Sequence, residues 1–149
     1  MPFDHLEWPR RLKEVEREHT AARIAMDRFT DQAAKDPMLL RGVGFPDIGR
    51  ASEELEGTYI IRLFAEFETA LRTFWTTYRP KEPPSRALDL MNGVASTARI
   101  DPIRLDDAHT VRRFRNVLAH NRDEPAEPIS IAIVRRRLNK YLGFLSRPR

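Results

Sequence analysis

Residues 53–75 read EELEGTYIIRLFAEFETALRTFW, a stretch in which apolar residues recur every three or four positions. This period predicts a helix, and the proline-rich segment RPKEPPS that follows should end it, so we expect the helix to span about residues 50–78. The apolar positions are Leu55, Tyr59, Ile60, Leu63, Phe64, Phe67, Ala70, Leu71 and Phe74. They form a broad arc, which is typical of a helix that packs against several neighbours.

Helical periodicity continues on both sides of this stretch, and no segment shows a convincing strand pattern with turn signals. Residues 36–49 contain two prolines and three glycines and are expected to form a loop. Ser85 is a suitable N-cap for a short third helix. The other helices are expected at about residues 6–35, 85–97, 106–121 and 129–145. The sequence thus predicts an all-α protein, a single-domain up-and-down bundle of about five helices covering residues 1–149.

Length and composition are those of an ordinary globular domain. The chain has 149 residues, of which 41% are hydrophobic and 32% charged. It contains no cysteine, which excludes disulfides, thiolate metal sites and cysteine nucleophiles. No apolar run approaches the roughly 18 residues needed to cross a bilayer, and the N-terminus is charged where a signal peptide needs an apolar segment. We therefore expect a cytoplasmic protein with no membrane partner.

The basic character of the chain comes almost entirely from arginine. The net charge is +4, with 22 arginines and 4 lysines among the basic residues. The planar guanidinium matches phosphate oxygens, so the arginine content fits a polyanionic partner. A high-GC genome that encodes arginine in place of lysine would give the same composition, and composition alone does not separate the two explanations.

The predicted fourth helix has two distinct faces. Val111, Phe114 and Leu118 form a narrow apolar stripe that should face the core. The neighbouring face carries alanines, which permit close approach of a partner, and polar side chains that are unsuited to a dry core. Its members are Ala108, Arg112, Arg115, Asn116, Ala119 and His120. We interpret this face as a subunit interface that encloses a polar cleft.

Arg115 and His120 lie at opposite edges of that face. Five residues of helix separate them by about 140° around the axis and about 7.5 Å along it. Within one chain the two side chains cannot easily grip the same atom. Two copies related by a twofold axis could bring two arginines and two histidines into one groove.

The same two residues belong to the string VRRFRNVLAHN, which contains the pattern Arg-Asn-x-x-x-His. An arginine four to six residues before a histidine is a weak signal by itself, because about two matches are expected by chance in this chain. Arg104 and His109 form a second match, but two aspartates between them would compete for the arginine. The first match has an asparagine after the arginine and apolar residues in the gap, which separates it from the second.

This string closely resembles the signature of the HEPN domain superfamily, all-α proteins of bacterial toxin–antitoxin and antiviral systems that handle nucleotides and RNA. The preceding IIRLFAEFETALRTFW is similar to that family's second helix, which often carries an aromatic–Glu pair, here Phe67 and Glu68. The resemblance covers roughly 40 residues well and the rest only as an order of helices. It implies a HEPN-like bundle.

The resemblance also implies a homodimer in which both motifs line one cleft. Such a cleft would cut single-stranded RNA without a metal or a cofactor, leaving a 2′,3′-cyclic phosphate and a 5′-hydroxyl. Arg115 would hold and polarise the scissile phosphate, His120 would transfer protons, and Asn116 would orient its neighbours. The chemistry agrees, because RNA supplies its own 2′-OH nucleophile, histidine titrates near neutral pH and arginine keeps its charge.

Within such a family a toxin or defence role is expected, and an antitoxin protein is a candidate partner. Family toxins paired with nucleotidyltransferase antitoxins often carry a tyrosine two residues after the histidine. This chain has Arg122 at that position, which puts pairing with that class of antitoxin in doubt. Many family members are non-catalytic, so the alternative function is a HEPN-like dimerisation or RNA-binding module.

Arg112, Glu66 and Glu68 are candidates for supporting the site or for binding RNA. Glu66 falls within the apolar arc of the second helix, which makes it the better geometric candidate for a buried partner of an arginine, with edge exposure as the alternative. Glu68 precedes Arg72 by four residues, the order of a surface ion pair, and the resemblance offers a family role instead. Residues 135–137 are three arginines that should lie on a solvated face, with contact to an RNA backbone as the alternative.

Other polar residues have structural explanations. His19 lies in the apolar stripe of the first helix and is interpreted as a core or interface histidine. Glu16 with His19, and Asp106 with His109, have the spacing of di-iron ligands, but such a site needs a glutamate in both pairs, so no metal ligand is predicted. The glycines within residues 42–49 lack the Lys-Ser/Thr of a P-loop and are interpreted as loop glycines.

Overall fold

The computed structural model describes residues 3–120 and 126–146, and these residues form helices and connecting loops without a β-strand. The prediction of an all-α bundle with five helices is confirmed. The five are α1 (Glu7–Lys35), α2 (Phe45–Tyr78), α3 (Ala87–Ala98), α4 (Pro102–His120) and α5 (Ile131–Gly143), and two short 3-10 helices are η1 (Pro37–Leu40) and η2 (Phe144–Ser146).

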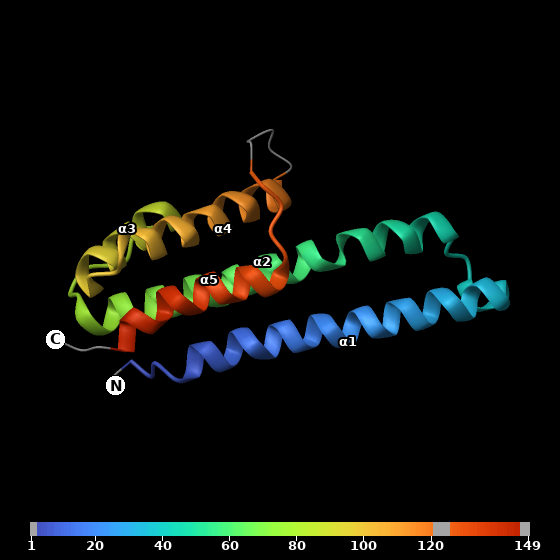
Figure 1. Ribbon diagram of the computed structural model, residues 1–149, viewed down its shortest axis with the longest axis horizontal. Coiled ribbons are helices and arrows are strands. Elements are labelled where there is room, and N and C mark those ends of the chain that lie inside the picture. Colours follow the sequence, from blue (N-terminus) through green and yellow to red (C-terminus); the bar gives the residue numbers. More distant parts are fainter. Residues whose placement is uncertain (1–2, 121–125, 147–149) are drawn as a thin grey trace.

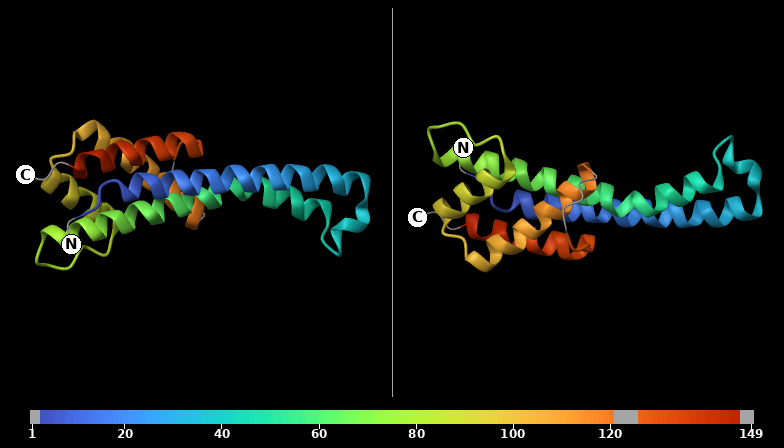
Figure 2. Two further views of the ribbon diagram at one scale, coloured as in Figure 1. Left: turned by 90° about the horizontal axis from the view of Figure 1, so that it is seen from below. Right: turned by 90° about the horizontal axis from the view of Figure 1, so that it is seen from above.

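The chain runs out along α1, back along α2, out again along α4 and back along α5, with the short α3 between α2 and α4 (Figures 1 and 2). Helix α2 contacts all four other α-helices, as its broad apolar arc predicts. A single core cluster contains residues from all five α-helices. Within the described ranges, no helix has both the length and the apolar content that crossing a membrane requires.

Tyr141 shows how tightly the centre of the bundle is packed. Its side chain is fully buried on α5, and its ring meets the ring of Phe67 edge-on at 5.0 Å. The hydroxyl donates a hydrogen bond of 2.7 Å to the carbonyl of Met91 on α3, which satisfies the buried polar group. Burial raises the pKa of Tyr141, so the hydroxyl stays protonated and can keep donating.

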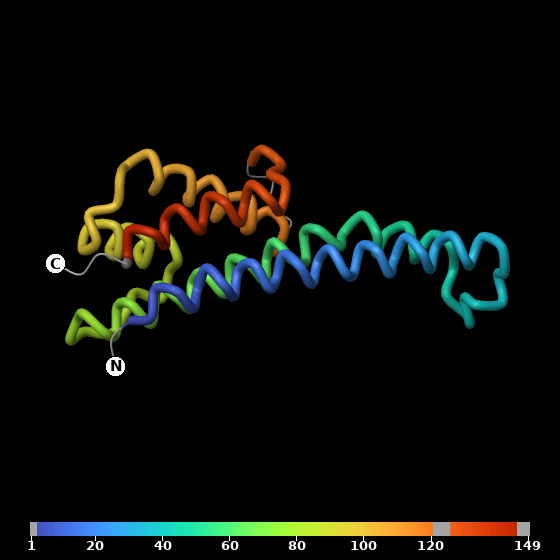
Figure 3. The backbone as a smooth tube through the Cα atoms, turned by 60° about the horizontal axis from the view of Figure 1, so that its bottom comes forward, coloured from blue at the N-terminus to red at the C-terminus, as the bar shows by residue number. Residues whose placement is uncertain are grey.

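The α1–α2 hairpin extends well beyond the other helices (Figures 1 and 3). We call residues 21–56 the arm and the other described residues the body. Gly57 lies at the boundary, because a Cβ atom at this position would be 3.2 Å from Leu118 Cδ2 on α4. Within the arm only Ala33 and Ile48 are buried, so most arm side chains contact solvent.

Helix α2 begins five residues earlier than the sequence pattern predicts. The predicted loop of residues 36–49 contains η1 and the first turn of α2. Pro46 is accommodated because the first turn of a helix does not need a proline N–H, and the Asp47 carboxylate accepts the Gly44 N–H at 2.9 Å. The proline and glycines of this segment therefore mark a helix start as well as a turn.

Helices α3 and α4 also differ from the prediction at their starts. The N-cap of α3 is Arg86. The Ser85 carbonyl instead accepts a hydrogen bond from Arg72 on α2. Helix α4 begins at Pro102, four residues before the predicted Asp106, and the Asp101 carboxylate accepts the Ile103 N–H at 2.8 Å. The structure describes α4 as far as His120, and the predicted last residue of this helix, Asn121, lies outside the described residues.

Candidate functional site

The Arg115 side chain points from α4 toward α2 and is largely covered, with 19% of its surface exposed. Its guanidinium carbon lies 4.5 Å from the centre of the Phe64 ring, a cation–π arrangement. Its Nη2 atom donates to Glu68 Oε1 at 3.3 Å. Two residues of α2 thus fix the position of this arginine.

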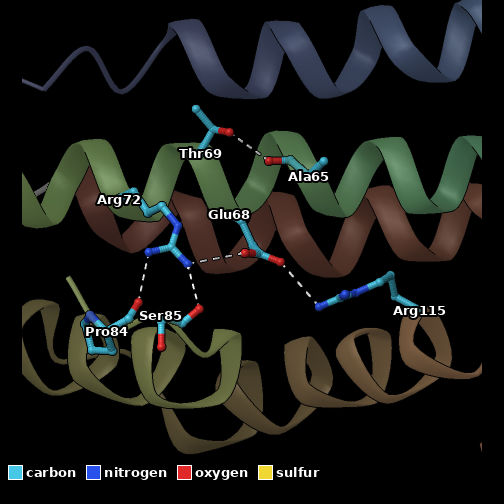
Figure 4. Close-up of polar contacts among 7 residues, drawn as sticks. All are labelled: Ala65, Glu68, Thr69, Arg72, Pro84, Ser85 and Arg115. Carbon is cyan, nitrogen blue, oxygen red and sulfur yellow. Dashed lines mark hydrogen bonds and ion pairs between the residues drawn. The ribbon is translucent and has the colours of Figure 1, made fainter. Parts of the chain in front are cut away.

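Glu68 connects Arg115 to a second arginine (Figure 4). The other carboxylate oxygen of Glu68 is 3.6 Å from Arg72 Nη2. Arg72 in turn donates to the carbonyls of Pro84 and Ser85, at 2.9 and 3.0 Å. The network therefore links α4, α2 and the loop before α3, and the i,i+4 spacing of Glu68 and Arg72 was the part of it visible in the sequence.

Glu66, for which the sequence left open a buried arginine partner or exposure at the edge, pairs with Arg11 and is partly exposed. Its carboxylate is 3.7 Å from Arg11 on α1, and both side chains are about one-third exposed or more, at 33% for Glu66 and 42% for Arg11. Glu66 lies within the apolar arc of α2, but this part of the arc faces α1. Glu68, which lies toward α4, is the residue that reaches Arg115.

The Nε atom of Arg115 is buried and has no hydrogen-bond partner among the described residues. A buried, unpaired donor on a charged group is costly, so it needs an explanation. The guanidinium carbon lies over the Phe64 ring, and Nη2 rather than Nε makes the hydrogen bond to Glu68. The position is thus fixed by stacking and one ion pair, with the Nε edge left unsatisfied.

His120 lies at the exposed end of α4, and Ala119 beside it is exposed as well. Asn116, one turn earlier, is partly buried. Arg115 and His120 are separated by about 140° around the helix, so the arginine faces α2 while the histidine faces away from it. Because α4 continues to His120, helix geometry directs the two side chains apart within one chain.

The prediction that Ala108 belongs to a subunit interface is wrong. Ala108 is fully buried within the chain and belongs to the core cluster. On the helical wheel Ala108 and Arg115 lie about 20° apart, so both face α2 rather than solvent. The exposed part of the predicted interface is therefore narrower than expected and is centred on Ala119 and His120.

Arg112 contacts the histidine of the second Arg–His match. Its Nε donates to His109 Nδ1 at 3.1 Å, and His109 Nε2 lies 2.8 Å from Asn92 Oδ1 on α3. A histidine that accepts at Nδ1 and donates from Nε2 is neutral. Burial, followed by the charges of Arg112 and Arg113, lowers the pKa of His109 below its ordinary value of 6.5. This histidine links α3 to α4 and does not meet Arg104.

The arginines of residues 135–137 divide between the fold and the solvent. Arg135 forms an ion pair with Glu16 on α1, and Arg137 donates to Thr110 Oγ1 on α4 at 2.7 Å. Arg136 is exposed. Two of the three thus help to attach α5 to its neighbours, which the pattern of charges alone could not show.

The residues of the di-iron alternative are also engaged elsewhere. Glu16 pairs with Arg135, and His109 pairs with Asn92 and Arg112. His19 is buried beside the ring of Tyr59, at 5.5 Å between ring centres, and its Nε2 has no hydrogen-bond partner in the described part of the chain. Across residues 3–120 and 126–146, no three His, Asp or Glu side chains are grouped so that they could hold a metal ion.

Arg115, Asn116 and His120 therefore form a candidate site in which the arginine is preset by Glu68 and Phe64 and the histidine is accessible. No family model, curated protein or solved structure matches the chain.

Proposed function

We propose that the protein is a homodimeric, metal-independent endoribonuclease of the HEPN type that cleaves single-stranded RNA. The observation that carries this proposal is the contrast between two side chains of one helix end. Arg115 is held in place at 19% exposure by an ion pair and a stacked ring, whereas His120 is exposed. A fixed cation and an accessible proton carrier are the two elements that RNA cleavage by its own 2′-OH needs.

The arrangement of the two side chains supports a site made by two copies. Because Arg115 and His120 diverge by about 140°, one chain cannot place both on one phosphate. A twofold axis near the exposed Ala119 would bring the ends of two α4 helices together, and the small side chain permits close approach. His120 of the partner subunit would then lie near Arg115.

The proposed reaction needs two proton transfers and one stabilised charge. The 2′-oxygen attacks phosphorus, and its proton passes to His120 of the partner subunit. The bond between phosphorus and the 5′-oxygen then breaks, and the same histidine returns the proton to the leaving oxygen. Arg115 offsets the charge that develops on the phosphoryl oxygens, while Asn116 orients the neighbouring groups. The products are a 2′,3′-cyclic phosphate and a 5′-hydroxyl.

A cytoplasmic toxin or defence protein, with an antitoxin as partner, is the biological setting that we propose for this activity. Arg122 replaces the tyrosine that some family antitoxins modify, and this residue lies outside the described part of the chain. We therefore favour an antitoxin that acts by binding over one that modifies the chain at this position.

One observation favours a second function, that of a non-catalytic dimerisation or RNA-binding module. Arg115 already has a carboxylate partner within its own chain. A phosphate would have to share the guanidinium with Glu68, and a purely structural arginine would have the same environment. Both functions are compatible with the same fold, and they differ only in whether RNA is cut.

Incubation of the purified protein with labelled single-stranded RNA in excess EDTA distinguishes these functions. We expect cleavage that leaves cyclic-phosphate ends, and its loss in His120→Ala. His5→Ala is the matched control, because His5 is also exposed but lies at the start of the chain. The His5 variant should cleave like the wild type.

A stable dimer that binds RNA but does not cut several unrelated RNAs would establish the non-catalytic module. Cleavage that persists in His120→Ala would remove His120 from the site, and cleavage that stops in EDTA would contradict the metal-free reaction.

A further inference from the structure

The arm carries more of the exposed large hydrophobic side chains than the body does. Six of the eleven large hydrophobic side chains that are exposed in the described residues lie within residues 21–56: Ile24, Phe29, Met38, Leu39, Val43 and Phe45. Met38 at the tip is 84% exposed. Two helices alone cannot cover these side chains, since only Ala33 and Ile48 are buried between them. Exposed apolar side chains that are concentrated in one segment favour a surface that another molecule covers.

A hollow of about 440 Å³ lies along one side of the arm, between α1 and α2. Phe45 and Ile48 supply its apolar part, and Gly49 leaves it open, because a Cβ atom at that position would meet no heavy atom within 4 Å. The remaining lining residues are Asp27, Thr30, Asp31, Ser52 and Glu53. The hollow thus combines an aromatic ring with three carboxylates.

Two of those carboxylates have no basic partner in the described part of the chain. Arg23 donates to Ser52 Oγ at 2.7 Å and lies 4.0 Å from Asp27, so Asp27 has a basic neighbour. Among the described residues, no basic nitrogen lies within 4.0 Å of the carboxylates of Asp31 and Glu53. An arginine from another molecule could pair with these two and stack on the exposed ring of Phe45.

We propose that the arm is a docking surface for a basic amphipathic helix of another protein, whose arginine enters this hollow while its apolar side chains cover Phe45 and the tip. The arm offers two antiparallel helices with Phe45 and Ile48 lining the hollow between them, along which a third helix can pack in a three-helix arrangement. The flanking carboxylates select a helix with basic residues beside its apolar stripe.

The distribution of charge argues against RNA as the occupant. Residues 21–56 contain five basic and seven acidic residues, a net charge of −2. The whole chain carries +4, so the other residues carry +6. A polyanion is therefore attracted to the body and repelled by the arm. This inference is independent of the proposed ribonuclease activity, which concerns the end of α4.

The same charges argue against a second copy of the chain. A twofold contact brings identical patches together, so two arms joined at the hollow would place the carboxylates of one copy against those of the other. Like charges that face each other in an interface disfavour it. A partner with basic residues has no such penalty.

Two synthetic helical peptides of 18 residues test the proposal with the full chain. Both carry the same leucine stripe, flanked by arginines in one peptide and by glutamates in the other. Fluorescence anisotropy of the labelled peptides is measured against increasing protein. We expect saturable binding of one arginine peptide per chain and at least tenfold weaker binding of the glutamate peptide.

Variants of the hollow locate the binding. Asp31→Asn with Glu53→Gln should weaken binding of the arginine peptide about tenfold, and Glu54→Gln is the matched control, because Glu54 is exposed on the arm but does not line the hollow. Gly49→Leu should abolish binding by filling the hollow, and the open space around Gly49 allows the fold to tolerate it. Cleavage of RNA should be unchanged in all these variants.

Three results would overturn the proposal. They are the absence of binding by the arginine peptide, equal binding of both peptides, and equal binding by the wild type and the hollow variants. Sedimentation that shows self-association of the wild type, lost in Gly49→Leu, would instead identify a second copy as the occupant.

Discussion

Arg115 and Glu68 are 47 positions apart in the sequence and are joined across α4 and α2 by an ion pair of 3.3 Å. The pair is partly buried, with 19% and 24% of the two side chains exposed. Because Glu68 also reaches Arg72, one carboxylate serves two arginines. The candidate site and the packing of the bundle therefore depend on the same side chain.

Glu68→Gln should lower the free energy of unfolding by about 1 kcal/mol, because it removes the charge that both arginines share while preserving the shape of the side chain. Glu66→Gln is the control, since its pair with Arg11 is longer and more exposed, and it should cost less than about 0.5 kcal/mol. Urea denaturation measures both. Equal effects of the two substitutions would contradict the special position of Glu68.

Arg115→Ala should destabilise the protein by about 2 kcal/mol, because the side chain packs on Phe64 and on Glu68. His120→Ala should change stability by less than about 0.5 kcal/mol, since His120 is exposed at the helix end. Thermal or urea unfolding compares the two variants. A His120 variant that unfolds would make His120 structural and would remove it from the site.

A mixture of inactive variants tests whether the site spans two chains. In a dimer of Arg115→Ala with His120→Ala, one groove would retain the arginine of one chain and the histidine of the other. We expect the mixture, unfolded and refolded together, to recover cleavage that neither variant shows alone. Each variant refolded by itself is the control. A folded mixed dimer without activity would place the working arginine and histidine in the same chain.

His109 should make stability depend on pH. Its pKa is lowered by burial and by Arg112 and Arg113, while Asp106 opposes this, so the unfolded chain binds the proton more tightly than the folded chain. The stabilisation is therefore complete above about pH 6.5 and is lost as the pH falls from there through the lowered pKa of the folded state.

His109→Gln should flatten this dependence, because glutamine does not titrate. The comparison is the urea midpoint of the wild type and the variant between pH 5 and 7, with His5→Gln as the control for an exposed histidine. Parallel curves for wild type and His109→Gln would show that another group is responsible.

Gly93→Ala should destabilise the contact between α3 and α2. A Cβ atom at Gly93 would lie 2.6 Å from Trp75 Cζ3, and the buried ring cannot easily move. We expect a loss of about 1–3 kcal/mol, although alanine favours helices. Gly49→Ala meets nothing within 4 Å and should instead stabilise the protein by about 0.5–1 kcal/mol. Tryptophan fluorescence during denaturation measures both.

Helix content and the central position of α2 could be predicted from the sequence because they depend on local periodicity. Apolar residues that recur with the helical period must be buried, and the broad arc of α2 required several neighbours. The starts of α2 and α4 were missed, since a proline that breaks a helix interior is favoured in the first turn. Whether a proline ends a helix or begins one depends on where the capping residue lies.

The arm also could not be predicted. Both helices of the hairpin can be predicted from their periodicity, and Met26 and Phe29 continue the spacing of the buried residues Leu12, Val15 and His19. Whether a stripe is covered depends on the length of the helices that pack against it. Helices α3, α4 and α5 are shorter than α1 and α2, so the arm extends beyond them (Figure 3).

The sequence by itself determined the helices, the central place of α2 and the divergence of Arg115 and His120, because the geometry of one helix fixes them. Only the tertiary structure decided that Glu68 and not Glu66 meets Arg115. The two glutamates differ by about 200° around α2, and which direction faces α4 is set by the packing of the whole bundle. Partners within a helix follow from spacing, whereas partners between helices follow from packing.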